Sequence, residues 1–283
     1  MGRIGTGGPK MYSQRVTRSN PTLFVFLLDR STSMEAAIAG RDQSKAAFVA
    51  DALNSTVANT SLKCASHEGV RDYVHVVALG YGYDVSSVLP GARVRQPISE
   101  LANGPLRLET RSVLTGDGTG GVVDREVQLP VWVEPEASGL TPMVTALEQA
   151  YTVVDEWVRE FPNGFPPLVM NITDGGATDG DPRPVADRIR KLSTSDGEAL
   201  LFNVHVSDFG GDSVRYPVTP ADLAGVEDEL AHVLFDMSSE IPPLMVERAA
   251  AAGIAVRANA RGMVYLAEAS DVVRFLDFGT DTI

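Results

Sequence analysis

The sequence predicts an α/β fold built on a doubly wound, mainly parallel sheet that helices cover on both faces. Short apolar runs rich in Val, Leu and Phe alternate along the chain with longer segments of helical period, which is the arrangement of successive βαβ units. The apolar runs also lack polar–apolar alternation, as strands buried on both faces do. These two observations together indicate the fold class.

The expected strands and helices follow from these patterns in chain order. Strands are expected at residues 22–28, 73–80, 168–173, 200–207 and 262–267. Helices are expected at residues 42–59, 142–160, 184–192, 241–252 and 271–278. The helix from residue 142 has an apolar stripe that includes Met143, Leu147 and Val154, and Ser270 is the expected cap of the last helix.

The chain is expected to form one domain over residues 21–283, because no linker-like stretch follows residue 20. Residues 1–20 contain four basic residues and no acid, which favours a flexible basic leader, with a segment that lies back on the acidic body or touches a partner as the alternative. Six glycines fall within residues 91–135, where we expect an insertion that carries a hairpin at a sheet edge.

Charge and cysteine content limit the class of protein. The formal net charge of −13 argues against a nucleic-acid binder, which needs clustered Lys and Arg to neutralise phosphates. Cys64 is the only cysteine, so no intrachain disulfide can form and a reducing compartment fits. The first apolar run is too short for a signal peptide, and nothing is long enough to span a bilayer. We therefore expect a cytoplasmic protein.

Polar residues follow the ends of three predicted elements. Residues 29–33 (DRSTS) follow the first strand, residues 139–143 (GLTPM) precede the long helix, and residues 173–175 (TDG) end the strand from residue 168. In doubly wound sheets, ligands bind outside the carboxyl ends of the strands, where the strand order reverses. The three clusters are therefore candidates for one site.

Each cluster also has a purely structural interpretation. Ser33 and Thr141 are suitable helix caps, and proline after Thr141 fits a first helical position. Asp174 followed by glycine is typical of a turn. The occurrence of all three at strand ends or helix starts of one sheet favours a shared function.

The chemistry of these side chains indicates a hard cation. Mg²⁺ prefers oxygen ligands in near-octahedral geometry and retains several waters. The hydroxyls of Ser31, Ser33 and Thr141 can coordinate it without neutralising its charge. Asp29 and Asp174 can bind directly or through waters. The predicted metal site thus consists of these five residues, with Mn²⁺ as the alternative ion.

This pattern resembles the metal-ion-dependent adhesion site of von Willebrand factor A (VWA) domains. The resemblance extends to bacterial stand-alone proteins of that class through residues 11–21, 165–175 and 275–280. It implies a six-stranded, mostly parallel sheet with one antiparallel edge strand. It further implies that a carboxylate from a protein partner fills the open position of the ion, in a bacterial signalling or stress-response system whose genes include kinases and phosphatases.

The sequence departs from the family pattern at two positions. Many members have glycine where this chain has Thr32, and Arg30 replaces a small or neutral residue. A solvated Arg30 is one interpretation, and a rim charge that attracts an acidic ligand is the other. Neither change removes a predicted metal ligand.

Two other functions compete with the metal-dependent interaction module. A Mg²⁺-dependent hydrolase, such as a phosphatase, would need a nucleophile or activated water and a positioned acid or base. Asp29 is a weak candidate nucleophile because position 31 is serine rather than aspartate. A metal-free scaffold is the third possibility. We expect no catalytic residues and no enzyme activity.

Other polar residues have mainly structural interpretations. Asp179 and Asp181 are expected to be solvated turn acids, with a second cation site or an outer-shell role as the alternative. Asn203, His205 and Ser207 occupy alternate positions of one strand, so they share a face. Hydrogen bonds to a neighbouring helix or to the insertion are the expected explanation.

Overall fold

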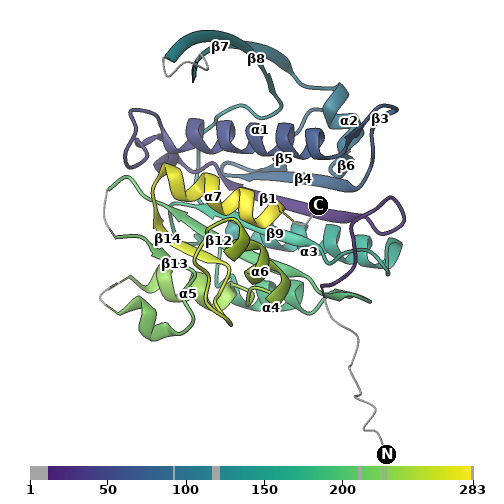
Figure 1. The fold of residues 1–283 in the computed structure, drawn as a ribbon. Helices are drawn as coiled ribbons and strands as arrows, with labels where there is room; N and C mark the ends of the chain where they lie inside the picture. Colours follow the sequence, from purple (N-terminus) through teal and green to yellow (C-terminus); the bar gives the residue numbers. More distant parts are fainter. Residues whose placement is uncertain are drawn as a thin grey trace, which may run out of the picture.

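The central part of the fold is a mixed sheet whose middle strands are parallel (Figure 1). The structure is a computed structural model that describes residues 12–91, 93–116, 122–209, 212–224, 226 and 228–281. The strand order is β13-β14-β12-β9-β1-β4-β5, with β6 also paired to β4. The strands of this sheet are β1 (Thr22–Asp29), β4 (Val74–Tyr81), β5 (Val85–Ser87), β6 (Gln96–Pro97), β9 (Leu168–Thr173), β12 (Leu200–Val206), β13 (Val214–Arg215) and β14 (Met263–Ala267).

The α/β fold class and the mostly parallel sheet are confirmed, whereas the expected number of strands is wrong. Strands β4, β1, β9, β12 and β14 pair in parallel. Antiparallel strands lie at both edges, β13 at one and β5 and β6 at the other. These edge strands contain only two or three residues each, so they lack the apolar runs from which strands are predicted.

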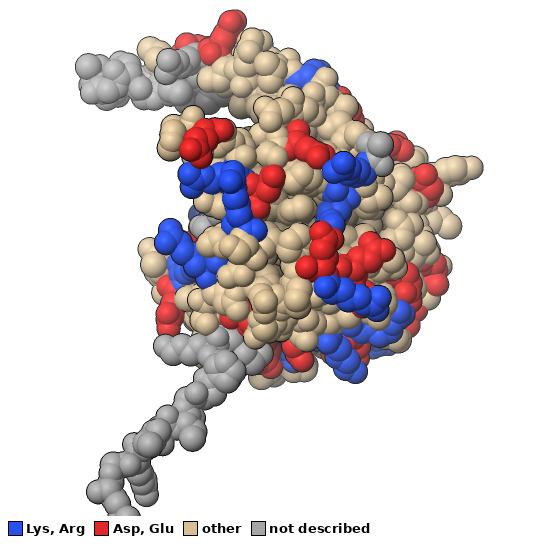
Figure 2. Space-filling view, turned by 90° about the vertical axis from the view of Figure 1, so that its right-hand side faces the viewer, with Lys and Arg blue, Asp and Glu red and all other residues tan. Residues whose placement is uncertain are grey.

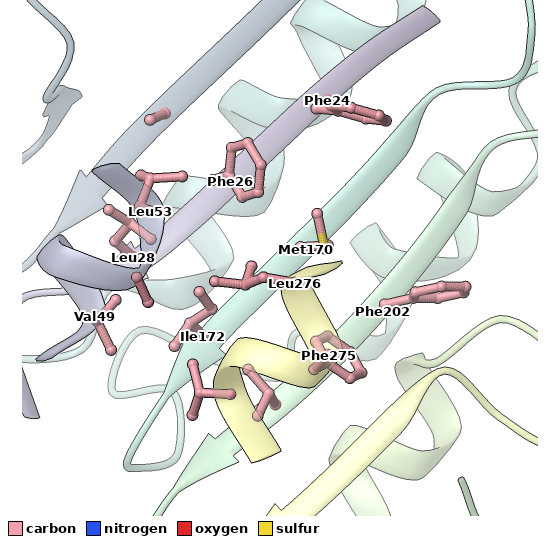
Figure 3. Packing of buried hydrophobic residues seen from close by; sticks show 14 of the residues in the cluster. Phe24, Phe26, Leu28, Val49, Leu53, Met170, Ile172, Phe202, Phe275 and Leu276 are labelled. Atoms are coloured by element: carbon pink, nitrogen blue, oxygen red, sulfur yellow. The ribbon is translucent and has the colours of Figure 1, made fainter. Parts of the chain in front are cut away.

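Two helical layers enclose the sheet, and alternate residues of β1 contact different layers. Phe24, Phe26 and Leu28 pack with residues of α1 and α7, as Figure 3 shows. Leu23, Val25 and Leu27 pack with residues of α3, α4 and α5. The first layer comprises α1 (Lys45–Lys63), α2 (Ile98–Asn103), α6 (Pro243–Ala251) and α7 (Ala269–Thr280); the second comprises α3 (Met143–Glu160), α4 (Arg183–Arg190) and α5 (Glu229–Met237).

Several helix starts differ from their predicted positions. Helix α1 begins at Lys45 rather than residue 42, because Ser44 caps it by accepting a hydrogen bond from Ala47 N. The predicted capping by Ser270 is wrong, since α7 begins after Glu268, whose side chain takes part in a capping box. Helix α5 was not predicted, although Ala231, Leu234 and Phe235 form a buried stripe on it.

A hairpin occupies much of the range predicted as an insertion. Strands β7 (Arg107–Gly116) and β8 (Val122–Val131) form a two-stranded sheet of their own, separate from the main sheet. The hairpin arches beside α1 rather than extending a sheet edge (Figure 1). The glycines at positions 118, 120 and 121 lie outside the described residues.

The start of the described chain lies against the body of the protein. Tyr12 N donates a hydrogen bond to Asp196 O, and the Asp196 carboxylate accepts from Ser13 N and Gln14 N. Residues 1–11 of the predicted leader, with Arg3 and Lys10, lie outside the described part of the chain.

The surface carries mixed charge, and two small hairpins and two 3₁₀ helices complete the described secondary structure. Acidic and basic side chains lie next to one another on the face shown in Figure 2. No described helix is long and apolar enough to cross a membrane. The minor elements are the hairpin β2 (Ala65–Ser66) and β3 (Gly69–Val70), the hairpin β10 (Ser193–Thr194) and β11 (Gly197–Glu198), and the 3₁₀ helices η1 (Thr32–Glu35) and η2 (Pro220–Leu223).

The segment that follows the hairpin is anchored on α1 by one buried amide. Asn54 Oδ1 accepts hydrogen bonds from Trp132 N and Val133 N, each 2.9 Å long, and Asn54 Nδ2 donates to Val133 O over 3.0 Å. Asn54→Ala would leave these buried backbone groups without partners. We expect it to lower the free energy of unfolding by about 2–4 kcal/mol, measured by urea denaturation.

Ser55→Ala provides the matched control. Ser55 is the next residue of α1, but it is exposed and its hydroxyl donates only to Asp51 O within the helix. Its replacement should change stability by less than about 0.5 kcal/mol. Equal effects of the two substitutions would show that the Asn54 amide does not anchor this segment.

Candidate metal centre

The candidate site lies where the order of the parallel strands reverses. The chain runs from β1 to β4 on one side, and β9, β12 and β14 follow on the other. The register aligns Leu28 of β1 with Ile172 of β9. Asp29 at the end of β1 therefore lies beside Thr173 at the end of β9, and Thr173 Oγ1 donates to Asp29 Oδ2 over 2.7 Å. This is the place where doubly wound sheets bind ligands.

Four of the five predicted residues form one continuous chain of hydrogen bonds. Ser31 N donates to Asp29 Oδ1 over 2.8 Å, and the hydroxyls of Ser31 and Ser33 lie 3.0 Å apart. Ser33 Oγ donates to Asp174 Oδ1 over 2.7 Å. The structure thus joins the loop after β1 to the loop after β9 through side-chain oxygens.

The local backbone explains how two serines reach the same point. Ser31 has an extended backbone, with φ −64° and ψ 160°, and the 3₁₀ turn η1 begins at Thr32. The loop is therefore extended only in part, and the turn brings Ser33 back toward Ser31. The interpretation of Ser33 as a helix cap is wrong, because Ser44 caps α1.

Thr141 lies on the third loop, which is hydrogen-bonded to the first. Thr32 donates from both N and Oγ1 to Gly139 O, at 3.2 Å each. Gly139 has φ +84°, and a Cβ there would lie 2.5 Å from Tyr83 N. Only glycine fits this close approach without strain. Thr141 itself is buried and follows Gly139 by two residues.

The hydroxyl of Thr141 is not used as the predicted helix cap. Helix α3 begins at Met143, and the Asp179 carboxylate accepts hydrogen bonds from Val144 N and Thr145 N near its start. Among the described residues, the Thr141 hydroxyl has no hydrogen-bond partner. Asp179 is exposed, as expected of a solvated acid, but its carboxylate also binds the first turn of α3.

Burial determines the electrostatics of Asp29. Its residue surface is only 2% exposed. Burial raises the pKa of Asp29 to about 6 from the ordinary 3.8, and the hydrogen bonds from Ser31 and Thr173 offset this rise in part. The negative charge of Asp174 also raises the pKa. A bound cation would relieve both penalties.

Lys45 is a member of the site that sequence reasoning missed. Lys45 Nζ lies 2.7 Å from Asp174 Oδ2, and the two side chains are only 5% and 1% exposed. The contact is an ion pair without the direction of a hydrogen bond, so Asp174 Oδ2 is buried with no hydrogen-bond partner among the described residues. The available signal was the unusual lysine in the first turn of a helix that starts close to the DRSTS loop.

The donor set fits a hard cation. It consists of two carboxylates and three hydroxyls on adjoining loops, and the one carboxylate oxygen without a hydrogen bond, Asp174 Oδ2, is paired with the Lys45 ammonium. Mg²⁺ and Mn²⁺ accept such oxygen donors. No group of three His, Cys, Asp or Glu side chains suited to a metal occurs in the described ranges, so any ion at this site depends on the hydroxyls.

A buried polar row crosses the sheet beneath the site. Tyr81 Oη donates to Asn171 Oδ1 over 2.8 Å, Asn171 Nδ2 donates to Asn203 Oδ1 over 3.1 Å, and Asn203 Nδ2 donates to Ser238 Oγ over 2.9 Å. Asn203 therefore bonds next to α5, as expected. Burial raises the pKa of Tyr81 well above its ordinary value, so this row stays neutral.

His205 lies near the site, and it contacts Tyr265 rather than the helix that Asn203 contacts. Its ring stacks on Tyr265 at 4.4 Å between centroids, and Tyr265 Oη donates to the Asp228 carboxylate. Burial lowers the pKa of His205, so the imidazole is neutral at pH 7. Ser207 Oγ donates to Phe209 O, and within the described residues its hydroxyl forms no bond to a helix or to the insertion.

Arg30 is only partly solvated, and its alternative role as a rim charge for an acidic ligand stays a prediction. Its side chain is 20% exposed and pairs with Glu136. It crosses the end of β4, where a Cβ at Gly80 would lie 2.3 Å from Arg30 Cδ. The glycine therefore makes room for the arginine. Asp181, the other acid beyond the site, is exposed and accepts hydrogen bonds from Arg183.

Comparisons with known proteins find only distant structural likenesses. No family model matches the chain, and no curated protein matches it. Among solved structures, the pilus adhesin SpaC from Lactobacillus rhamnosus GG is 12% identical with a TM-score of 0.47, covering 97% of this chain and 31% of that protein.

The names of two further solved structures refer to VWA or to a vWF domain. The ArnB paralog VWA2 from Sulfolobus acidocaldarius is 10% identical with a TM-score of 0.34, over 66% of this chain and 35% of that one. The vWF domain of the pilus tip protein Mfa5 from Porphyromonas gingivalis is 13% identical with a TM-score of 0.32, over 56% and 39%. The chain spans less than two-fifths of each of these proteins, and the likenesses concern the general arrangement of strands and helices.

The raised pKa of Asp29 makes a prediction about stability in chelator. Between pH 3.8 and about 6, Asp29 is protonated in the folded protein and ionised in the unfolded chain, so its contribution to stability falls as pH rises. Asp29→Asn removes this cost. We expect the variant to gain about 1–3 kcal/mol relative to wild type between pH 4 and pH 7.5, measured by urea unfolding.

Asp42→Asn serves as the control, because Asp42 is exposed. Its stability difference from wild type should be nearly the same at both pH values. If the difference for Asp29→Asn does not change between pH 4 and pH 7.5, Asp29 is not held at a raised pKa.

Proposed function

We propose that this protein is a metal-dependent protein-interaction module. Mg²⁺, or Mn²⁺ as the alternative, would be held by Asp29, Ser31, Ser33, Thr141 and Asp174. An Asp or Glu carboxylate of a protein partner would complete its coordination. The bound ion would supply a positive charge and an open position for one more oxygen.

One observation carries this proposal: the unbroken hydrogen-bonded row from Asp29 through Ser31 and Ser33 to Asp174 at the switch point of the sheet. Each member offers oxygen, and the two at its centre are neutral. If Asp29 and Asp174 bind through waters, the direct protein ligands are neutral hydroxyls, which leave most of the double charge on the ion. Such an ion favours a further anionic ligand.

A hydrolase on this site is supported less well. Asp29 would have to act as nucleophile, yet its two carboxylate oxygens already accept hydrogen bonds from Ser31 N and Thr173 Oγ1. The nearby His205 is stacked on Tyr265. A panel of phosphoester substrates tests this alternative, and turnover that is lost in Asp29→Ala would favour it.

A metal-free scaffold is favoured by one specific observation. The ion pair of Lys45 with Asp174 supplies the site with a cation of its own. On this hypothesis, the protein would bind its partner equally well in chelator. The cytoplasmic location and the setting among kinases and phosphatases in a bacterial signalling or stress-response system stay hypotheses from the family resemblance.

Direct titration with Mg²⁺ tests the metal site. We expect wild-type protein to bind one ion, and Ser31→Ala and Thr141→Ala each to weaken the affinity by about tenfold or more, because each removes one oxygen ligand. Isothermal titration calorimetry measures the affinities, and circular dichroism shows whether each variant folds.

Thr32→Ala is the matched control, since its hydroxyl lies in the same loop but donates to Gly139 O. Its Mg²⁺ affinity should stay within about threefold of wild type. Absence of Mg²⁺ and Mn²⁺ binding by folded wild-type protein would contradict the proposed function. Equal losses in all three variants would contradict the assigned ligands.

Partner binding gives a second test. We expect a protein captured from the native cell in the presence of Mg²⁺ to be lost in chelator and lost with Thr141→Ala, and retained with Thr32→Ala. Replacing Asp and Glu residues of that partner one by one should identify a single essential carboxylate. Capture that survives both chelator and Thr141→Ala would place the contact elsewhere.

A further inference from the structure

Lys45 combines two unfavourable features. It is the first residue of the 19-residue helix α1 and only 4% exposed. A cation at a helix N-terminus opposes the helix dipole, and burial removes its hydration. Such a residue is tolerated where a nearby carboxylate compensates, and Asp174 Oδ2 lies 2.7 Å from its ammonium.

The backbone fixes the position of Lys45 beside the metal ligands. Lys45 N donates to Ala36 O over 2.8 Å, just beyond the 3₁₀ turn that carries Ser33. Ser44 caps the helix directly before it. The loop of residues 36–44 thus returns the chain to the site, where the Lys45 ammonium pairs with Asp174.

Lys45 changes the net charge of the site. At neutral pH the buried charges are Asp29, Asp174 and Lys45, which sum to −1, while His205 is neutral. A divalent cation makes the loaded site +1. Without Lys45, the two carboxylates would neutralise the ion completely. Asp179 and Asp228 also act on the buried groups nearby, but the hydrogen bonds of their carboxylates go to the start of α3 and to Leu230 N and Tyr265.

We propose that Lys45 is a built-in counter-cation that weakens metal binding by the free site and strengthens binding of a carboxylate to the metal-loaded site. The inference rests on the proposed function, since it concerns the same ion and the same ligand. The carboxylate would bring the loaded site from +1 to neutrality. Metal and carboxylate would raise each other's affinity through their own attraction, whereas Lys45 would lower the affinity for the metal and raise the affinity for the carboxylate.

The test compares Mg²⁺ affinities of wild type, Lys45→Met and Lys45→Arg by calorimetry, in chloride and in acetate buffers of equal ionic strength. We expect Lys45→Met to bind Mg²⁺ about tenfold or more tightly than wild type in chloride, because a buried repulsive charge is removed. Acetate should tighten Mg²⁺ binding by wild type more than by Lys45→Met. Lys45→Arg keeps the charge and should resemble wild type.

Two further variants serve as controls, one for the loss of a lysine elsewhere on α1 and one for misfolding of Lys45→Met. Lys63→Met removes the lysine at the other end of α1, which forms a partly exposed ion pair with Asp281, and should leave Mg²⁺ affinity unchanged. Lys45→Gln is neutral but can still donate to Asp174, and replaces Lys45→Met if that variant does not fold. Its Mg²⁺ affinity should also rise.

The outcomes separate this inference from the proposed function. If wild type binds Mg²⁺ and the folded neutral variants bind it no more tightly, Lys45 only holds Asp174 in place and the inference fails. If wild type does not bind Mg²⁺ but a neutral variant does, the counter-cation is supported and the proposed metal function of the natural chain is refuted. If neither binds, both are refuted.

Discussion

The burial of two carboxylates at the switch point of the sheet is the constraint on which the site depends. The register of β1 and β9 brings Asp29 beside Thr173 and therefore close to Asp174. Burial destabilises the ionised form of Asp29, as its raised pKa shows. Each carboxylate oxygen of Asp29 and Asp174 has its own polar partner, which offsets part of the cost of burial. A backbone N–H and a hydroxyl serve Asp29, whereas a hydroxyl and the ammonium of Lys45 serve Asp174. Every other feature of the site follows from how these charges are balanced.

The position of the site could be predicted from sequence because parallel strands end at one edge. Buried apolar runs located β1 and β9 to within a residue, and the polar clusters after them had to meet. The role of Thr141 as a cap could not be judged in this way, because the competing cap, Asp179, comes from a distant loop. Lys45 was missed for a related reason: its side chain reaches Asp174 only through the return of the loop before α1, which no local periodicity records.

The strands of the main sheet that sequence reasoning missed share a physical property. Strands β5, β6 and β13 are two or three residues long and lie at the edges, so pairing with a neighbour defines them and their own residues do not. The helices with long apolar stripes, α1 and α3, were found; the start of α1 is set by the Ser44 cap, and α1 ends at Lys63, four residues beyond the expected end. Pattern thus specifies the interior of an element, whereas tertiary contacts specify its ends and the sheet edges.

The apolar core and the charged site are formed by different residues, so the fold can be stable although Asp29, Asp174 and Lys45 are buried. Both apolar layers pack on β1 through residues that do not belong to the site. The loops are held by backbone contacts, notably Thr32 with Gly139 and the close approach of Gly139 to Tyr83. The charges of Asp29, Asp174 and Lys45 are therefore positioned by a scaffold whose stability comes from elsewhere. The net charge of this edge is set by three side chains, so one substitution among them can change it without disturbing the core.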